Sequence, residues 1–109
     1  MDNHYNHFKK IDAHSHIGKF GSPFNIDFDL SRLTEQMEEY NIEKTILCPA
    51  WCHLNKELKE AYQAAPDKII PLCWVNANEG QEAYDMLEHY LRDENFAGVK
   101  MQPLFDAFT

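Results

Sequence analysis

Apolar residues along this chain gather in short runs that alternate with amphipathic stretches. Residues 9–16, 43–50, 69–76 and 96–102 read as strands. The second and third, EKTILCPA and IIPLCWVN, are nearly continuous apolar runs, which is the pattern of strands in a parallel sheet covered by helices. The first strand has mixed polarity, and Pro103 closes the fourth.

Between these strands, apolar residues recur at spacings of three and four, which marks one face of a helix in each interval. The three stripes are Leu30, Leu33, Met37 and Tyr40; Leu54, Leu58, Ala61, Tyr62 and Ala65; and Ala83, Leu87, Tyr90 and Leu91. Asp29 or Ser31 is a suitable cap for the first helix, and Asn55 for the second. Asn41 suits the left-handed residue that ends a helix.

Strand and helix therefore alternate along the chain, which indicates an α/β fold of parallel βαβ units. Residues 17–29 hold two glycines and Pro23, and are expected to form a loop. We interpret residues 1–109 as a single domain, with residues 1–9 as a flexible polar leader. Two architectures fit this order, a small open sheet and part of an eight-stranded barrel, and periodicity alone does not separate them.

Charge and composition narrow the class of function. The 109 residues include 10 Lys and Arg against 18 Asp and Glu, for a net charge of -8, so the field of the protein repels nucleic acid. No apolar run approaches the roughly 20 residues of a membrane span, and Met1 to Lys10 lack the apolar core of a secretion signal. Three cysteines form no disulfide framework. A cytoplasmic protein with no nucleic-acid or membrane partner is expected.

The segment Ile11 to His16, IDAHSH, carries the most chemistry. Strand residues two apart share a face, so Asp12, His14 and His16 are expected to point the same way. Two imidazoles on one face at a strand end can bind one metal ion. Asp12 lies one step deeper, where a carboxylate can accept an imidazole N–H or join the ligands. The alternative is that they are two surface histidines near a loop.

The motif IDAHSHIG resembles the first-strand metal motif of the amidohydrolase superfamily. Three later segments are similar to that family's next helices and strands in order and spacing: LTEQMEEYNIEKTILCPA, ELKEAYQAAPDKIIPLCWVN and FAGVKMQP. The resemblance runs from about Lys10 to Phe108 and is greatest to the branch that contains metal-dependent decarboxylases. It implies the N-terminal half of a (β/α)₈ TIM barrel, because such a barrel needs about 250 residues.

This resemblance implies a metal-dependent hydrolase that acts on a small carbonyl-containing substrate through a metal-activated water, with zinc as the expected ion. The alternative is a metal-dependent decarboxylase of the same fold. In the family, further ligands and a catalytic aspartate come from later strands, so the isolated chain is expected to bind metal poorly and to catalyse little. A third possibility is a non-catalytic half-barrel that self-associates or pairs with a missing C-terminal half through its open strand edges.

Other residues are weaker candidates for a site. The resemblance implies that Lys100 could carry a carboxylated amine that bridges two metal ions. The alternative is an ordinary lysine at the end of a strand. Related sequences often carry histidine at the position of Gln102. Trp51, Asn76 and Phe105 follow the ends of strands, where a parallel fold binds its substrate, although packing under loops explains each equally well.

The cysteines and the remaining histidines do not form a second metal motif. The Cys48, Cys52 and His53 spacing lacks the paired cysteines of a zinc site. Cys48 and Cys73 lie in apolar strands and are expected to be buried thiols.

Overall fold

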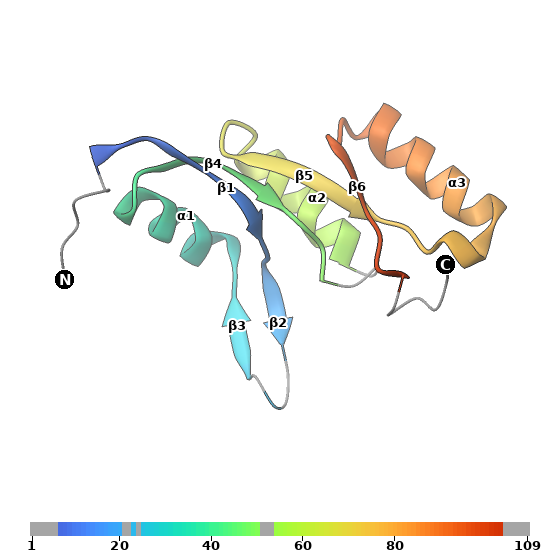
Figure 1. Ribbon diagram of the computed structural model, residues 1–109, viewed down its shortest axis with the longest axis horizontal. Helices are drawn as coiled ribbons and strands as arrows, with labels where there is room; N and C mark the ends of the chain where they lie inside the picture. The colour runs from blue at the N-terminus through green and yellow to red at the C-terminus, as the bar shows by residue number, and fades with distance from the viewer. Residues whose placement is uncertain (1–6, 21–22, 24, 51–53, 104–109) are drawn as a thin grey trace.

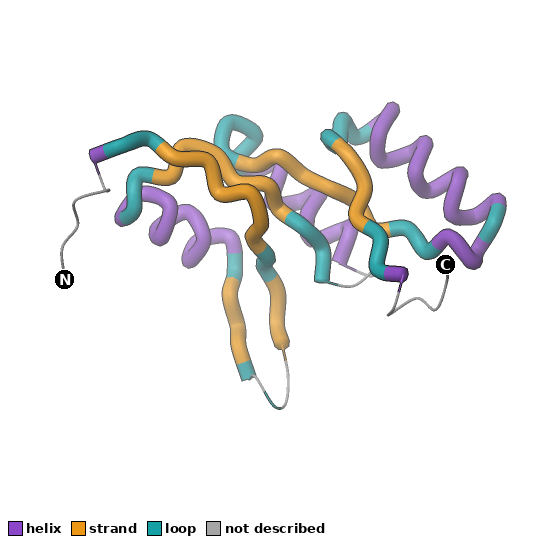
Figure 2. Tube along the Cα trace, in the orientation of Figure 1, coloured by secondary structure: helices purple, strands orange, loops and turns teal. Residues whose placement is uncertain are grey.

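The computed structural model describes residues 7–20, 23, 25–50 and 54–103. Four strands form a parallel sheet in the order β1-β4-β5-β6 (Figure 1). They are β1 (Lys10–Ser15), β4 (Ile42–Leu47), β5 (Ile69–Trp74) and β6 (Gly98–Lys100). The helices α1 (Leu30–Glu39), α2 (Asn55–Ala64) and α3 (Gln81–Glu88) lie one in each of the three intervals between neighbouring strands (Figure 2). The predicted parallel α/β order is confirmed.

The hydrophobic core lies between one face of the sheet and the helices. In β5, Ile69 and Cys73 are buried on this face, while Ile70 and Leu72 alternate with them and are partly exposed. The core residues are Ile17, Leu33, Met37, Leu47, Leu54, Leu58, Ala61, Ile69, Cys73, Val75, Ala83 and Phe96. Because helices cover only one face, the other face of the sheet remains partly open.

The first helix begins and ends where the sequence predicts. The Asp29 carboxylate accepts a hydrogen bond from the Arg32 backbone N–H at 2.9 Å, which caps α1. Asn41 follows the helix with a φ of 54°, the left-handed conformation that asparagine tolerates. Local chemistry therefore sets both ends of this helix.

The expectation of a plain loop over residues 17–29 is wrong. Two three-residue strands, β2 (Gly18–Phe20) and β3 (Ile26–Phe28), pair there as an antiparallel hairpin that projects away from the main sheet (Figure 1). Gly18 does not interrupt structure but begins β2 with a φ of 135°, which favours glycine. Ile17 is buried in the core beside the hairpin, so packing holds the base of a segment whose strands are too short to show alternation.

The expectation that Asn55 caps the second helix is also wrong. Leu54 takes the cap position of α2 without a side-chain hydrogen bond. The buried Asn55 amide instead donates to the Trp74 carbonyl at 2.8 Å and accepts from the Trp74 N–H at 2.7 Å. The pairing of β4 with β5 ends at Leu47 and Pro71, so Asn55 takes the place of a strand partner for the end of β5.

The third helical stripe extends beyond the regular helix. After α3, residues His89–Asp93 form a π-helical turn, which changes the angular spacing of the side chains. Tyr90 still faces the core, with its ring centroid 4.9 Å from that of Phe96. Leu91 is 38% exposed, so its expected place on the buried stripe is wrong. No helix in the described part of the chain is long and apolar enough to cross a membrane.

We expect Asn55→Ala to destabilise the fold by roughly 2–4 kcal/mol, because it removes two buried hydrogen bonds to the backbone of Trp74. Urea denaturation followed by far-UV circular dichroism measures the change. Gln63→Ala, at an exposed position of the same helix, is the matched control. A loss no larger for Asn55→Ala than for this control would contradict the assigned role.

We also expect the chain to self-associate, because β1 and β6 each have one neighbouring strand in the sheet and leave an edge open. Exposed apolar side chains lie on these edge segments: Ile11 is 62% exposed and Met101 is 42% exposed. Light scattering should give a mass that rises with protein concentration. It should rise further with salt, which screens the net charge of -8. A monomer at high micromolar concentration and high salt would refute this expectation.

Candidate metal centre

A cavity of about 230 Å³ lies where the parallel strands of the sheet end. Its lining consists of His14, His16, Pro49, Ala50, Trp74, Lys100 and Gln102. These residues come from the carboxyl ends of the four strands or from the residues just after them. In parallel α/β folds this edge of the sheet is where ligands bind. The structure therefore brings both predicted histidines, together with Lys100 and Gln102, to the expected end of the sheet.

The two histidine side chains face each other. Their Nε2 atoms are 2.9 Å apart, with ring centroids 4.7 Å apart and ring planes at 66°. Two bare nitrogen lone pairs repel at this distance, so a proton or a cation must lie between them. Two imidazole nitrogens, each about 2.1 Å from one ion, are about 3 Å apart when the angle at the ion is near 90°. The pair therefore fits a shared metal ion.

The position of His16 is fixed from the next strand. Its Nδ1 lies 2.6 Å from the carbonyl oxygen of Cys48, directly after β4. Because a carbonyl only accepts, Nδ1 must carry the proton, and the neutral ring then presents a bare Nε2. The Cys48 N–H in turn donates to the Ser15 carbonyl at 2.8 Å, which ties the same two segments together. A carbonyl on the second ring nitrogen is the usual arrangement for a metal-binding histidine.

The surroundings of His16 favour its neutral form. Burial lowers the pKa of its imidazole, and the charges of His14 and Lys100 lower it further, against the opposing hydrogen bond to Cys48. Because the neutral imidazole is the form that binds metal, these surroundings reduce competition from protons.

Asp12 lies outside the cavity lining. Its carboxylate accepts a hydrogen bond from the His14 backbone N–H at 3.0 Å. The pairing of β1 with β4 shifts register between Asp12 and Ser15, so the strand is not regular along the motif. Asp12 thus supports the backbone at His14, and its role as a metal ligand remains a prediction.

Of the candidate substrate-binding residues, Asn76 lies in the described part of the chain. The Asn76 side chain accepts from the Asn78 N–H at 2.9 Å and lies outside the cavity lining. Trp51 and Phe105 fall outside the described residues. Trp74, which sequence reasoning missed, lines the cavity with only 2% of its surface exposed. Its position as the last residue of an apolar strand is the signal that could have identified it.

The cysteines form no zinc cluster in the described part of the chain. Cys48 and Cys73 are free and buried, as expected, and burial raises the pKa of the Cys73 thiol to about 11. Cys52 and His53 lie outside the described residues. Among the residues that are described, no group of three or more His, Cys, Asp or Glu could hold a metal ion. The histidine pair is therefore an incomplete ligand set.

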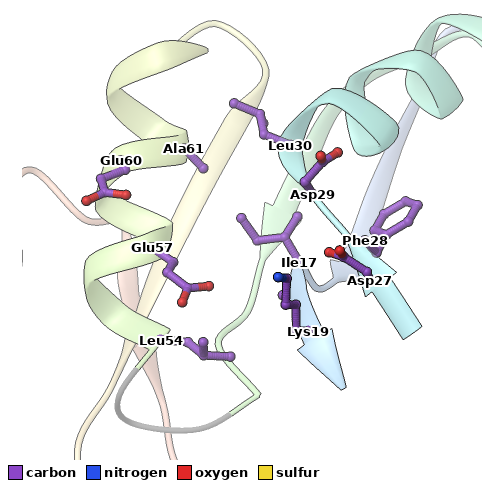
Figure 3. Close-up of a pocket in the computed structure, with 11 residues that line it drawn as sticks. Ile17, Lys19, Asp27, Phe28, Asp29, Leu30, Leu54, Glu57, Glu60 and Ala61 are labelled. Atoms are coloured by element: carbon purple, nitrogen blue, oxygen red, sulfur yellow. The ribbon is translucent and has the colours of Figure 1, made fainter. Parts of the chain in front are cut away.

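A larger hollow of about 550 Å³ lies away from the histidines, between α2 and the β2–β3 hairpin (Figure 3). Leu54, Glu57 and Glu60 border it from α2, and Asp27 and Asp29 border it from the opposite side. This hollow offers neither paired imidazoles nor the carboxyl ends of the parallel strands. Volume alone therefore does not identify the candidate centre.

No protein-family model matches this chain, and no curated protein does. Solved structures do share its fold. A 5-carboxyvanillate decarboxylase from Novosphingobium aromaticivorans, with bound manganese and 3-methoxy-4-hydroxy-5-nitrobenzoic acid, matches with a TM-score of 0.75 and 15% identity over 89% of this chain. A 2,6-dihydroxybenzoate decarboxylase in complex with 2,6-dihydroxybenzoate matches with a TM-score of 0.67 and 16% identity over 84% of this chain. A 2,6-dihydroxybenzoate decarboxylase from Rhizobium matches with a TM-score of 0.62 and 18% identity over 84% of this chain.

All three neighbours are decarboxylases. The fold predicted from the sequence resemblance is therefore confirmed, as a four-stranded parallel part of a TIM barrel. The chain spans only 42%, 38% and 36% of the lengths of the three neighbours. They match the decarboxylase alternative better than the hydrolase expectation, and the ion named in one of them is manganese, not zinc.

We expect His16 to titrate below the ordinary histidine pKa of about 6.5, because burial disfavours its charged form. Folding then favours the neutral ring, so this contribution to stability is complete above about pH 6.5 and is lost as the pH falls below it. Histidine NMR titration of the folded chain and of the urea-unfolded chain tests the pKa of His16. Urea melts of wild type and His16→Gln test the pH dependence. A midpoint for His16 in the folded chain equal to or above its midpoint in the unfolded chain would overturn this expectation.

Proposed function

We propose that this chain forms the N-terminal half of a metal-dependent decarboxylase barrel, with His14 and His16 as ligands of its divalent ion. The observation that carries the proposal is the pair of Nε2 atoms, 2.9 Å apart, at the carboxyl edge of a sheet whose fold is that of known decarboxylases. The Cys48 carbonyl supports the ligand role of His16, because it fixes the tautomer that leaves Nε2 bare.

The ion, when bound, would orient a substrate carboxylate and polarise it. Catalytic metal sites commonly use three protein ligands, and this chain brings two imidazoles together. Asp12 and Lys100 are weaker candidate ligands, and the others would come from the second half of the barrel. The chain alone is therefore proposed to bind metal weakly and to turn over little substrate.

The substrate class proposed is a small aromatic carboxylic acid, because the neighbours are decarboxylases of substituted benzoates. Hydrolysis through a metal-activated water remains the runner-up, and release of carbon dioxide by a completed barrel would separate the two. Manganese is the first ion to test, because the solved neighbour holds it. Zinc, the expectation from the histidine motif, serves as the comparison.

We expect the chain to bind Mn²⁺ weakly, and His14→Ala and His16→Ala each to weaken this binding by about tenfold or more, because each removes one of two converging ligands. Electron paramagnetic resonance of free Mn²⁺ in a protein titration measures the affinity, with competition by Zn²⁺ to rank the ions. His89→Ala is the control, because His89 is an exposed histidine outside the cavity. If the double variant binds as well as wild type, the proposed metal site is refuted.

A further inference from the structure

Lys100 differs from the other partly buried lysines of the described chain. The Lys59 ammonium pairs with Glu94 at 2.9 Å, and that of Lys68 pairs with Glu38 at 3.6 Å. Lys44 and Lys10 donate to backbone carbonyls at 2.9 Å and 2.8 Å. Among the described residues, Lys100 alone of this group has no hydrogen-bond or ion-pair partner. A partly desolvated ammonium without a partner is costly, so it favours a bound anion.

The cavity around Lys100 carries positive charge in an acidic protein. Its lining includes this lysine and two imidazoles but no carboxylate, although the chain has a net charge of -8. The ammonium acts on groups of the neighbouring segments as well. Burial raises the pKa of the Cys48 thiol, and the charge of Lys100 opposes that rise. Lys100 therefore lies near both the end of β4 and the histidine pair.

A buried aromatic residue borders the cavity beside this charge. Trp74 and Lys100 are paired neighbours in β5 and β6, and both line the cavity. Asn55 binds both backbone groups of Trp74, so the strand end that carries the indole is held in place. Pro49 and Ala50 add apolar surface. A volume of about 230 Å³ is small for a binding site, and it suits a single ring with a carboxylate better than a larger ligand.

We infer that Lys100 forms an anion subsite in which its ammonium binds the carboxylate of an aromatic acid, in a cavity bordered by Trp74, Pro49 and Ala50. This inference rests on the proposed function for the choice of aromatic acid, whereas the unpartnered lysine in a cavity without a carboxylate is independent of any metal. A single ammonium suits a singly charged carboxylate, whereas phosphate sites commonly add several backbone N–H groups.

The test is a titration of metal-free protein, prepared with a chelating resin, with 2,6-dihydroxybenzoate followed by ligand-detected NMR. We expect Lys100→Met to weaken binding by about tenfold, because it removes a charge-assisted hydrogen bond. Lys100→Arg should retain most of the affinity. Lys56→Met is the matched control, because it removes the same charge from an exposed position outside the cavity and should leave binding unchanged. Thermal melts check that each variant is folded.

The uncharged analogue resorcinol separates the carboxylate contact from the ring contact. It should bind more weakly than the acid, and equally to wild type and Lys100→Met. Equal loss of acid binding in Lys100→Met and Lys56→Met would overturn the inference, as would a carbon-13 carbamate signal on Lys100 in bicarbonate. Failure of the proposed function appears separately, as absence of histidine-dependent Mn²⁺ binding in protein that still binds the acid through Lys100.

Discussion

Side-chain hydrogen bonds hold the carboxyl edge of this sheet at the point where strand pairing stops. Strand β4 ends at Leu47, His16 directly follows the end of β1, and β5 extends to Trp74. The His16 ring binds the Cys48 carbonyl, and the Asn55 amide binds both backbone groups of Trp74. Each bond replaces a missing ladder contact. Because these contacts orient the walls of the cavity, the candidate centre depends on them as much as on its ligands.

The same edge concentrates positive charge in an acidic chain. Two imidazoles and the Lys100 ammonium line the cavity, and the Asp12 carboxylate, which could offset them, contacts the His14 backbone N–H instead. Burial favours the neutral form of the His16 imidazole. The Lys100 ammonium then supplies the positive charge of the cavity lining. A neutral nitrogen pair suits a metal ion, and an unpaired ammonium suits an anion. The proposed metal site and the proposed anion subsite can therefore occupy one small cavity without using the same atoms.

The sequence predicts the order of elements and the local caps well, because these follow from nearby residues. The Asp29 cap and the left-handed Asn41 depend on contacts within a few positions. Asn55 could not be assigned this way, because its partner, Trp74, lies on another strand. Leu91 is exposed because a π-helical turn changes the direction of its side chain, and the spacing of apolar residues does not predict such a turn. The histidine motif indicated the cavity, whereas Trp74 was missed although its place at the end of an apolar strand is a signal for it.

Completing the metal site and completing the fold are the same physical requirement. The open face of the sheet holds partly exposed apolar side chains such as Ile70 and Leu72, and both edge strands have a free side. A barrel encloses that face and pairs those edges. The elements that do so also surround the cavity at the carboxyl ends of the strands, where the histidine pair needs further ligands. Any segment that buries the apolar face therefore also lies beside the histidine pair.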